Sequence, residues 1–234
     1  MTTPQPTQSP DRQPRAERRF PLFRKRQCTL PTWRGWLVLL GILILATWLF
    51  IKQAYPFLAV SVRVPSKCMV IEGWATDSSM EAAAREFLQG NYETLYVVGV
   101  PLDRGVRLSE YESFAHLGKA ILLKLGVPET NLVAVPAPYV PQDRTYTCYK
   151  ALREHLDSRG SVPDSMLLIS EGAHARRSRL MAEWTMGENC RIGILALPPQ
   201  GFIPERWWTT SSGFKHVVTE ALSYLYARVL FKPA

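Results

Sequence analysis

Cysteine and histidine are scarce in this chain, which has four of each among its 234 residues. No group of them has the spacing of a zinc site, and no segment matches an EF-hand loop. The sequence also lacks a P-loop and a glycine-rich dinucleotide fingerprint after its first expected strand. We therefore predict a protein with no bound metal and no cofactor.

Net positive charge is scarce on most of the chain, although the formal net charge is +8. Residues 1–34 carry eight Lys and Arg side chains against two acidic ones, and Lys52 adds one more. A net charge of only +1 remains for residues 53–234. Nucleic-acid-binding domains carry their basic patch on the folded surface, so we expect no nucleic-acid partner.

Apolar periodicity is missing from residues 1–34, where six prolines are separated by residues such as Thr, Gln and Ser. Such a segment cannot bury enough apolar surface to offset the entropy lost on ordering. We predict a disordered basic tail over residues 1–34.

One long apolar run is present, from Gly35 to Ile51. Its 17 residues carry no charge, and 11 of them are Leu, Ile, Val or Phe. Each such side chain near the bilayer centre favours insertion by about 0.3 to 0.6 kcal/mol. The run predicts a transmembrane helix over residues 35–52, with residues 35–51 in contact with the lipid bilayer.

The distribution of Lys and Arg around this run predicts its direction. Six of them lie shortly before it, whereas Lys52 and Arg63 follow it. By the positive-inside rule, the amino terminus is expected in the cytoplasm and the main domain in the periplasm or outside the cell, with the helix in the plasma (inner) membrane. A cleaved signal peptide is the alternative, but the run exceeds a usual signal core and no A-x-A site follows it.

The cysteines divide between the two sides of the membrane in this prediction. Cys28 lies on the reducing side, and Cys68, Cys148 and Cys190 lie on the side where disulfides persist. One disulfide with a free thiol, or three reduced thiols, fit the sequence equally well.

Short apolar runs alternate with helical patterns in residues 67–234. The expected strands are residues 69–71, 95–98, 132–135, 166–169 and 192–197, all of the continuous apolar type that is buried on both faces. This alternation predicts an α/β fold, namely a Rossmann-like three-layer domain with a mostly parallel five-stranded sheet, preceded by one transmembrane helix. Residues 53–66 are expected to form a linker or an edge strand.

The helices between these strands have recognisable ends. Ser78 with Glu81, and Ser109 with Glu112, match capping boxes and predict two helix starts. Three more helices are expected over residues 144–158, 173–186 and 215–230. In the last of them Val218, Leu222, Leu225 and Val229 share one face.

The segment from Ser170 to Arg179 carries the main candidate site. It follows an expected strand, and Arg176 and Arg177 fall in the first turns of a helix, where the helix dipole disfavours cations. An anion should compensate, either Glu171 or Glu205 of the protein itself or a phosphate or carboxylate ligand. The alternative is a solvated basic helix end.

Two further side chains are candidates for chemistry. His174 is a candidate acid or base, or simply a capping residue, and Glu72 ends the central strand, where a buried carboxylate needs a partner or a ligand. Ser170 and Gly172 form only half of a nucleophile elbow, so a serine hydrolase is not supported. Ligands of such folds bind beyond the carboxyl ends of the strands. The residues assigned there to ligand or anion binding are Arg177, Arg176, Ser170, Gly73, Gly99, Glu112 and Thr145.

Several of these residues resemble motifs of the ElyC/SanA/YdcF family, over about residues 67–231. Ser170, His174 and Arg177 are similar to the family's strand-end Thr or Ser followed by a His-x-x-Arg helix start. Three further matches are Thr145-Tyr146, Gly126-Val127-Pro128 and a helix-start glutamate at Glu112 or Glu110. The chain departs from the family at Thr147-Cys148 and Glu72-Gly73-Trp74, which indicates a divergent branch.

The resemblance implies a membrane-anchored, Rossmann-like domain that serves cell-envelope biogenesis. We expect it to bind, and to process if it is an enzyme, an anionic envelope precursor, polysaccharide or lipid carrier that is phosphorylated or carboxylated. The alternative is a non-catalytic, membrane-tethered interaction module that supports envelope integrity. In that case Trp207, Trp208 and the C-terminal helix would contact an unknown protein partner or the bilayer surface.

Overall fold

The computed structural model describes residues 31–103 and 109–233. The tail predicted over residues 1–34 lies mostly outside the described residues, and so does Cys28. The chain divides into two units, one ending at Leu43 and the other running from Ile44 to Ala234.

Helix α1 (Trp33–Leu58) has 26 residues and is long and apolar enough to cross a membrane. It continues past the predicted end at residue 52, so the first part of the expected linker is helical. Ala54 and Leu58, in this additional part, are buried together with Trp207 and Val217. Burial of these apolar side chains explains why the helix continues beyond the apolar run.

The centre of the domain is a five-stranded parallel sheet, as predicted. Its strands are β1 (Cys68–Glu72), β2 (Thr94–Gly99), β3 (Leu132–Pro136), β4 (Ser165–Glu171) and β5 (Arg191–Leu197), in the order β3-β2-β1-β4-β5. All paired strands within it are parallel. Val62 forms a single antiparallel bridge to Ile194 of β5. It belongs to residues 53–66, for which the sequence left open a linker or an edge strand.

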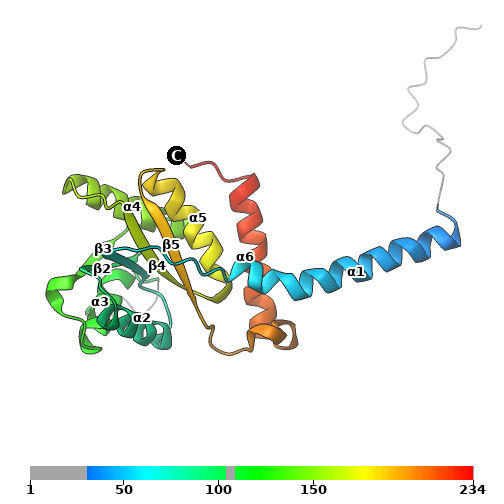
Figure 1. The fold of residues 1–234 in the computed structure, drawn as a ribbon, viewed down its shortest axis with the longest axis horizontal. Coiled ribbons are helices and arrows are strands. Elements are labelled where there is room, and N and C mark those ends of the chain that lie inside the picture. The colour runs from blue at the N-terminus through cyan, green and yellow to red at the C-terminus, as the bar shows by residue number, and fades with distance from the viewer. Residues whose placement is uncertain (1–30, 104–108, 234) are drawn as a thin grey trace, which may run out of the picture. The chain divides into compact units, whose positions relative to one another are not determined.

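Helices cover both faces of the sheet (Figure 1). They are α2 (Asp77–Gln89), α3 (Phe114–Lys124), α4 (Arg144–Ser158) and α5 (Ala175–Met186). Helix α6 (Ser211–Val229) packs on α5 rather than on the sheet, and short 3-10 helices lie at Glu129–Asn131, Gly172–His174 and Pro204–Thr209. Apolar residues of α2 and α3 pack with one face of the sheet, and those of α4 and α5 pack with the other. This gives the predicted three layers.

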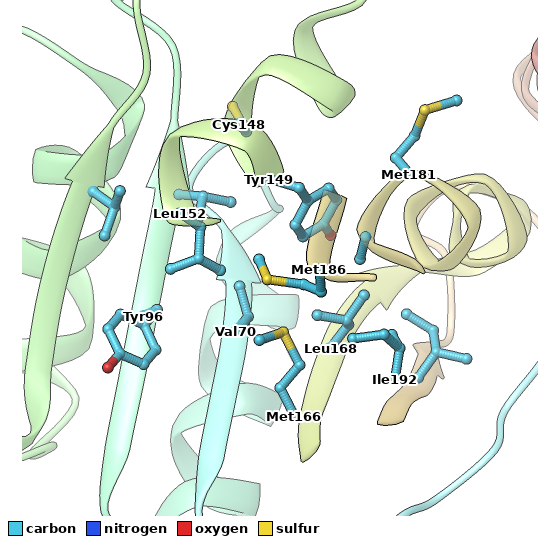
Figure 2. Packing of buried hydrophobic residues seen from close by; sticks show 14 of the residues in the cluster. Val70, Tyr96, Cys148, Tyr149, Leu152, Met166, Leu168, Met181, Met186 and Ile192 are labelled. Carbon is cyan, nitrogen blue, oxygen red and sulfur yellow. The ribbon is translucent and has the colours of Figure 1, made fainter. Parts of the chain in front are cut away.

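Alternate residues of each strand serve the two cores. Met69 and Ile71 of β1 face the α2 and α3 layer, whereas Val70 between them faces α4 and α5. Figure 2 shows the second core, where Val70 and Leu168 lie opposite Leu152 of α4. Because both faces are covered, the strands are continuously apolar.

The predicted starts of the first two sheet-covering helices were wrong. Helix α2 begins after Thr76, so Ser78 lies inside it. Helix α3 begins after Ser113, whose side chain accepts a hydrogen bond from the backbone N–H of His116 (3.3 Å). Glu112 therefore precedes the helix and takes no part in a capping box.

Most of the apolar face that the sequence indicates in α6 is exposed. Leu222, Leu225 and Val229 are 62%, 58% and 69% exposed. The buried residues of α6 are instead Gly213, Val217, Glu220 and Ala227. This helix has apolar residues on two faces, and periodicity alone does not tell which of them is covered.

All three described cysteines are free thiols. Cys148 and Cys190 are buried, and Cys68 is partly buried. Of the two alternatives that the sequence left open, the structure has the reduced one.

Candidate functional site

A cleft of about 710 Å³ lies beyond the carboxyl ends of the central strands. Glu72 is the last residue of β1 and Glu171 the last of β4, and both line it. From β1 the chain first adds β2 and β3 on one side of the sheet, and it then adds β4 and β5 on the other side. The order of the strands therefore reverses between the neighbouring strands β1 and β4. In open α/β sheets this switch point is where ligands bind.

Glu72 lies at the bottom of the cleft and is 3% exposed. Its Oε1 accepts hydrogen bonds from the hydroxyl groups of Ser178 (2.7 Å) and Tyr149 (3.2 Å). Burial alone would raise the pKa of Glu72, but the charge of His174 and the hydrogen bond from Ser178 outweigh burial and lower the pKa. Glu72 is therefore an ionised, buried carboxylate.

His174 lies between two carboxylates. Its Nε2 is 3.2 Å from Oε2 of Glu72, an ion-pair distance without hydrogen-bond geometry, and its Nδ1 is 3.1 Å from Oε1 of Glu220. Burial would lower the pKa of this imidazole, but the two carboxylates outweigh burial and raise the pKa to about 9. His174 is thus an imidazolium at neutral pH, with protons on both ring nitrogens.

Arg177 forms a two-point ion pair with the same Glu220. Its Nε donates to Oε2 (2.8 Å) and its Nη2 to Oε1 (2.9 Å), while Nη1 donates to Oγ1 of Thr145 (3.2 Å). Burial would raise the pKa of Glu220, but hydrogen bonds and charge from His174 and Arg177 outweigh it and lower the pKa. The compensating anion expected from the sequence is therefore Glu220.

Glu171 and Glu205, the two glutamates that the sequence offered as the compensating anion, do not pair with Arg177. Glu171 accepts a hydrogen bond from the hydroxyl group of Thr76 at the start of α2 (2.9 Å). Glu205 is exposed in the 3-10 helix Pro204–Thr209. Sequence reasoning missed Glu220, although one signal was present: it is the only acidic residue after Glu205 and belongs to a helix rich in apolar residues.

Glu72, His174, Glu220 and Arg177 together form a charge cluster with two anions and two cations. Nη2 of Arg177 also lies 3.0 Å from Nδ1 of His174. Because Nδ1 carries a proton in the imidazolium, we interpret this approach as two cations brought together by their shared carboxylate. The charge cluster is neutral, and its side chains come from β1, α5, α6 and the turn before α5.

Ser170 and Thr145 also line the cleft, and both are buried. Arg176 does not line it. This arginine lies over the ring of Phe57, with 4.0 Å from its Cζ to the ring centroid, and donates to the carbonyl oxygen of Phe57. Glu112 lines a separate hollow with His116 and Lys119.

Gly73 and Gly99 pack against the start of α3 and are not among the lining residues of the cleft. A Cβ atom on Gly73 would lie 2.1 Å from the carbonyl oxygen of Phe114, and one on Gly99 would lie 2.5 Å from the amide nitrogen of Ala115. Both glycines thus permit a close approach of backbones, which is the only role that the structure gives them.

A second group of lining residues, which we call the upper cleft, combines aromatic rings with the start of α4. Trp74, Phe114 and Tyr226 supply the rings. Asp143, the residue before α4, has a left-handed backbone conformation (φ 57°), and its own side chain makes no capping hydrogen bond. Arg144 lies beside it and also lines the cleft.

The described residues contain no group of three His, Cys, Asp or Glu side chains arranged to hold a metal ion. We compared the chain with protein-family models, curated proteins and solved structures, and none of them matched.

Proposed function

We propose that this chain is a membrane-anchored protein of cell-envelope biogenesis whose cleft binds an anionic, hydroxyl-bearing envelope precursor. The ligand class comprises phosphorylated or carboxylated glycans and lipid carriers. The observation that carries the proposal is the position of His174, a buried imidazolium held between Glu72 and Glu220 at the floor of the cleft. Maintaining a charge cluster in this position costs desolvation energy, which a purely structural core would avoid.

The chemistry of the charge cluster favours proton donation. An imidazolium with a pKa of about 9 holds its proton at neutral pH and can donate it to a leaving group or a developing oxyanion. Glu72 orients the ring from one side and Glu220 from the other. In this proposal His174 donates the proton from Nε2, whose approach to Glu72 lacks hydrogen-bond geometry, and Glu72 is an orienting carboxylate rather than a base.

The upper cleft fits an anion with attached hydroxyl groups. The positive end of the α4 dipole lies at the cleft, and Arg144, whose Nη1 is also 3.4 Å from Oδ2 of Asp103, adds a partly neutralised charge beside it. Arg177 contributes less to anion binding than the sequence suggested, because Glu220 already neutralises it. The rings of Trp74 and Tyr226 provide flat apolar surfaces of the kind that sugar rings stack on.

The location is proposed from the sequence together with α1. Basic residues precede the helix, so we place the amino end in the cytoplasm, the helix in the plasma (inner) membrane and the domain on its outer side. This arrangement, and the resemblance to the ElyC/SanA/YdcF family, support an envelope role.

The test is ligand-induced stabilisation of the full chain in detergent micelles, using glycan phosphates, uronic-acid glycans and polyprenyl phosphates. A ligand at about 100 times its Kd should stabilise the native state by roughly 2.7 kcal/mol, seen as a higher melting temperature. His174→Gln should reduce this shift. His155→Gln is the matched control, because His155 belongs to α4 and is not among the residues that line the cleft.

Two results would count against the proposal. An equal shift in wild type and His174→Gln would place the ligand outside the cleft floor. A complete lack of shifts, with both variants folded, would favour the non-catalytic interaction module, for which the exposed apolar face of α6 is the supporting observation.

A further inference from the structure

Helix α6 carries a row of apolar side chains that are more than half exposed, although the ring of Phe214 also lies 6.1 Å from that of Trp207. Phe214, Leu222, Leu225 and Val229 are 54%, 62%, 58% and 69% exposed. At about 100° per residue, these four side chains lie within roughly 80° of one another around the helix. They form one stripe, which also contains the partly buried Val218 and which we call the outer face of α6.

The charges beside the outer face are all positive. Lys215 lies on one side of the stripe and Arg228 on the other, and Lys232 follows the helix. The only acidic residue from 211 to 234 is Glu220, which is buried in the charge cluster on the opposite side of α6. An apolar stripe flanked by cations matches the surface of an anionic bilayer.

The inner side of α6 packs on the last turns of α1. Val217 is buried with Ala54 and Leu58, and the ring of Tyr224 lies 5.6 Å from that of Phe57. Lys52, just before these turns, is the first charged residue after the apolar run and is expected at the level of the lipid headgroups. Helix α6 therefore packs on the part of α1 that directly follows the point where α1 would leave the bilayer.

We propose that α6 lies on the bilayer that α1 crosses, with its outer face among the lipid headgroups and the first carbons of the acyl chains. The occupant of this surface is an anionic phospholipid layer. A second copy of the chain fits less well, because a symmetric pairing of two outer faces would bring Lys215 and Arg228 toward their own copies with no exposed acidic partner on α6. The inference requires that α1 spans a membrane, but it does not depend on any ligand of the cleft.

The experiment places a diazirine amino acid at Leu225 of the full chain, reconstituted in nanodiscs of phosphatidylcholine and phosphatidylglycerol. After illumination, mass spectrometry should find lipid adducts on the peptide that contains residue 225. Leu88 of α2 is the matched control, because it is a similarly exposed leucine (52%) on another helix. We expect roughly tenfold more adduct at residue 225 than at residue 88.

A second measurement tests the charges. In the double variant Lys215→Glu, Arg228→Glu the adduct at residue 225 should fall, and in nanodiscs of phosphatidylcholine alone it should fall for wild type too. Equal adducts at residues 225 and 88 would overturn the proposal. Cross-linking of residue 225 to a second copy of the chain would overturn it as well and would assign the outer face to a dimer.

Discussion

Four ionisable side chains share the cleft floor, and each depends on the others for its charge. Glu220 accepts from both His174 and Arg177, and Glu72 holds the other side of the His174 ring. Removing one member leaves an unpaired buried charge, which typically costs about 3 to 5 kcal/mol. For this reason Arg177→Ala would destabilise the domain and is a poor probe of ligand binding, whereas the side-chain amide of His174→Gln can still donate a hydrogen bond to a neighbouring carboxylate.

The raised pKa of His174 predicts a specific loss of stability in mild alkali. A group whose pKa rises on folding from 6.5 to about 9 stabilises the native state fully below pH 6.5, and this contribution disappears as the pH rises through 9. The contribution is at most about 3 kcal/mol. Urea unfolding of the full chain in micelles between pH 6 and 10 should show this decline, and His174→Gln should lack it.

His155→Gln provides the comparison, since burial lowers the pKa of His155 and a lowered imidazole pKa cannot cause a loss of stability as the pH rises. That variant should lose stability between pH 6.5 and 9 as wild type does. If His174→Gln shows the same decline as wild type, His174 is not the titrating group.

Sequence reasoning predicted three of the four members of the charge cluster. His174, Arg177 and Glu72 stand at strand ends or helix starts, where parallel strands of an α/β sheet bring side chains together. Glu220 lies in the middle of a helix and 46 residues from His174, and only the packing of α6 on α5 brings it to the cleft. Such a contact depends on tertiary packing, which local patterns do not specify.

At the level of elements, strands were easier to predict than helix ends. All five strands are continuous apolar runs. Each predicted strand end lies within two residues of the observed end. Helix starts failed at Ser78 and Ser109 because Ser, Thr, Asp and Glu are dense in both segments and offer several capping patterns. In the structure, the residues that directly precede the two helices are Thr76 and Ser113.

The close contact between β1 and α3 predicts that Gly73 cannot carry a side chain. Its added methyl group would meet the backbone carbonyl of Phe114 at 2.1 Å, and a backbone atom cannot rotate away. Gly73→Ala should lower the free energy of unfolding by about 1 to 3 kcal/mol, measured with urea. Gly41→Ala adds the same methyl group where no atom lies within 4 Å, so equal stability of the two variants would contradict this account.

For the whole molecule, the end of α1 is part of the domain. Leu58 is 1% exposed, and the indole Nε1 of Trp207 donates to the carbonyl oxygen of Ile51 (3.0 Å). Trp207 is thus a core residue, which answers one part of the interaction-module hypothesis. A domain cut from the chain after residue 58 would lose this packing.

We therefore predict that a chain starting at residue 59 is less stable than one starting at residue 44. The lost burial of Leu58 and Ala54, and the lost hydrogen bond of Trp207, should together cost about 2 to 5 kcal/mol. Thermal unfolding followed by tryptophan fluorescence would measure the difference. Equal melting temperatures for the two chains would show that the end of α1 is only a tether.

The place of Glu220 along the chain has a consequence for the order of events during synthesis. Every strand of the sheet, and both cations of the charge cluster, leave the ribosome before residue 220 does. Until α6 packs on the domain, His174 and Arg177 are both present, and Glu72 is the only carboxylate of the charge cluster that has been synthesised. The nascent chain can therefore assemble its layers early, but it becomes electrically balanced only when its last described helix docks.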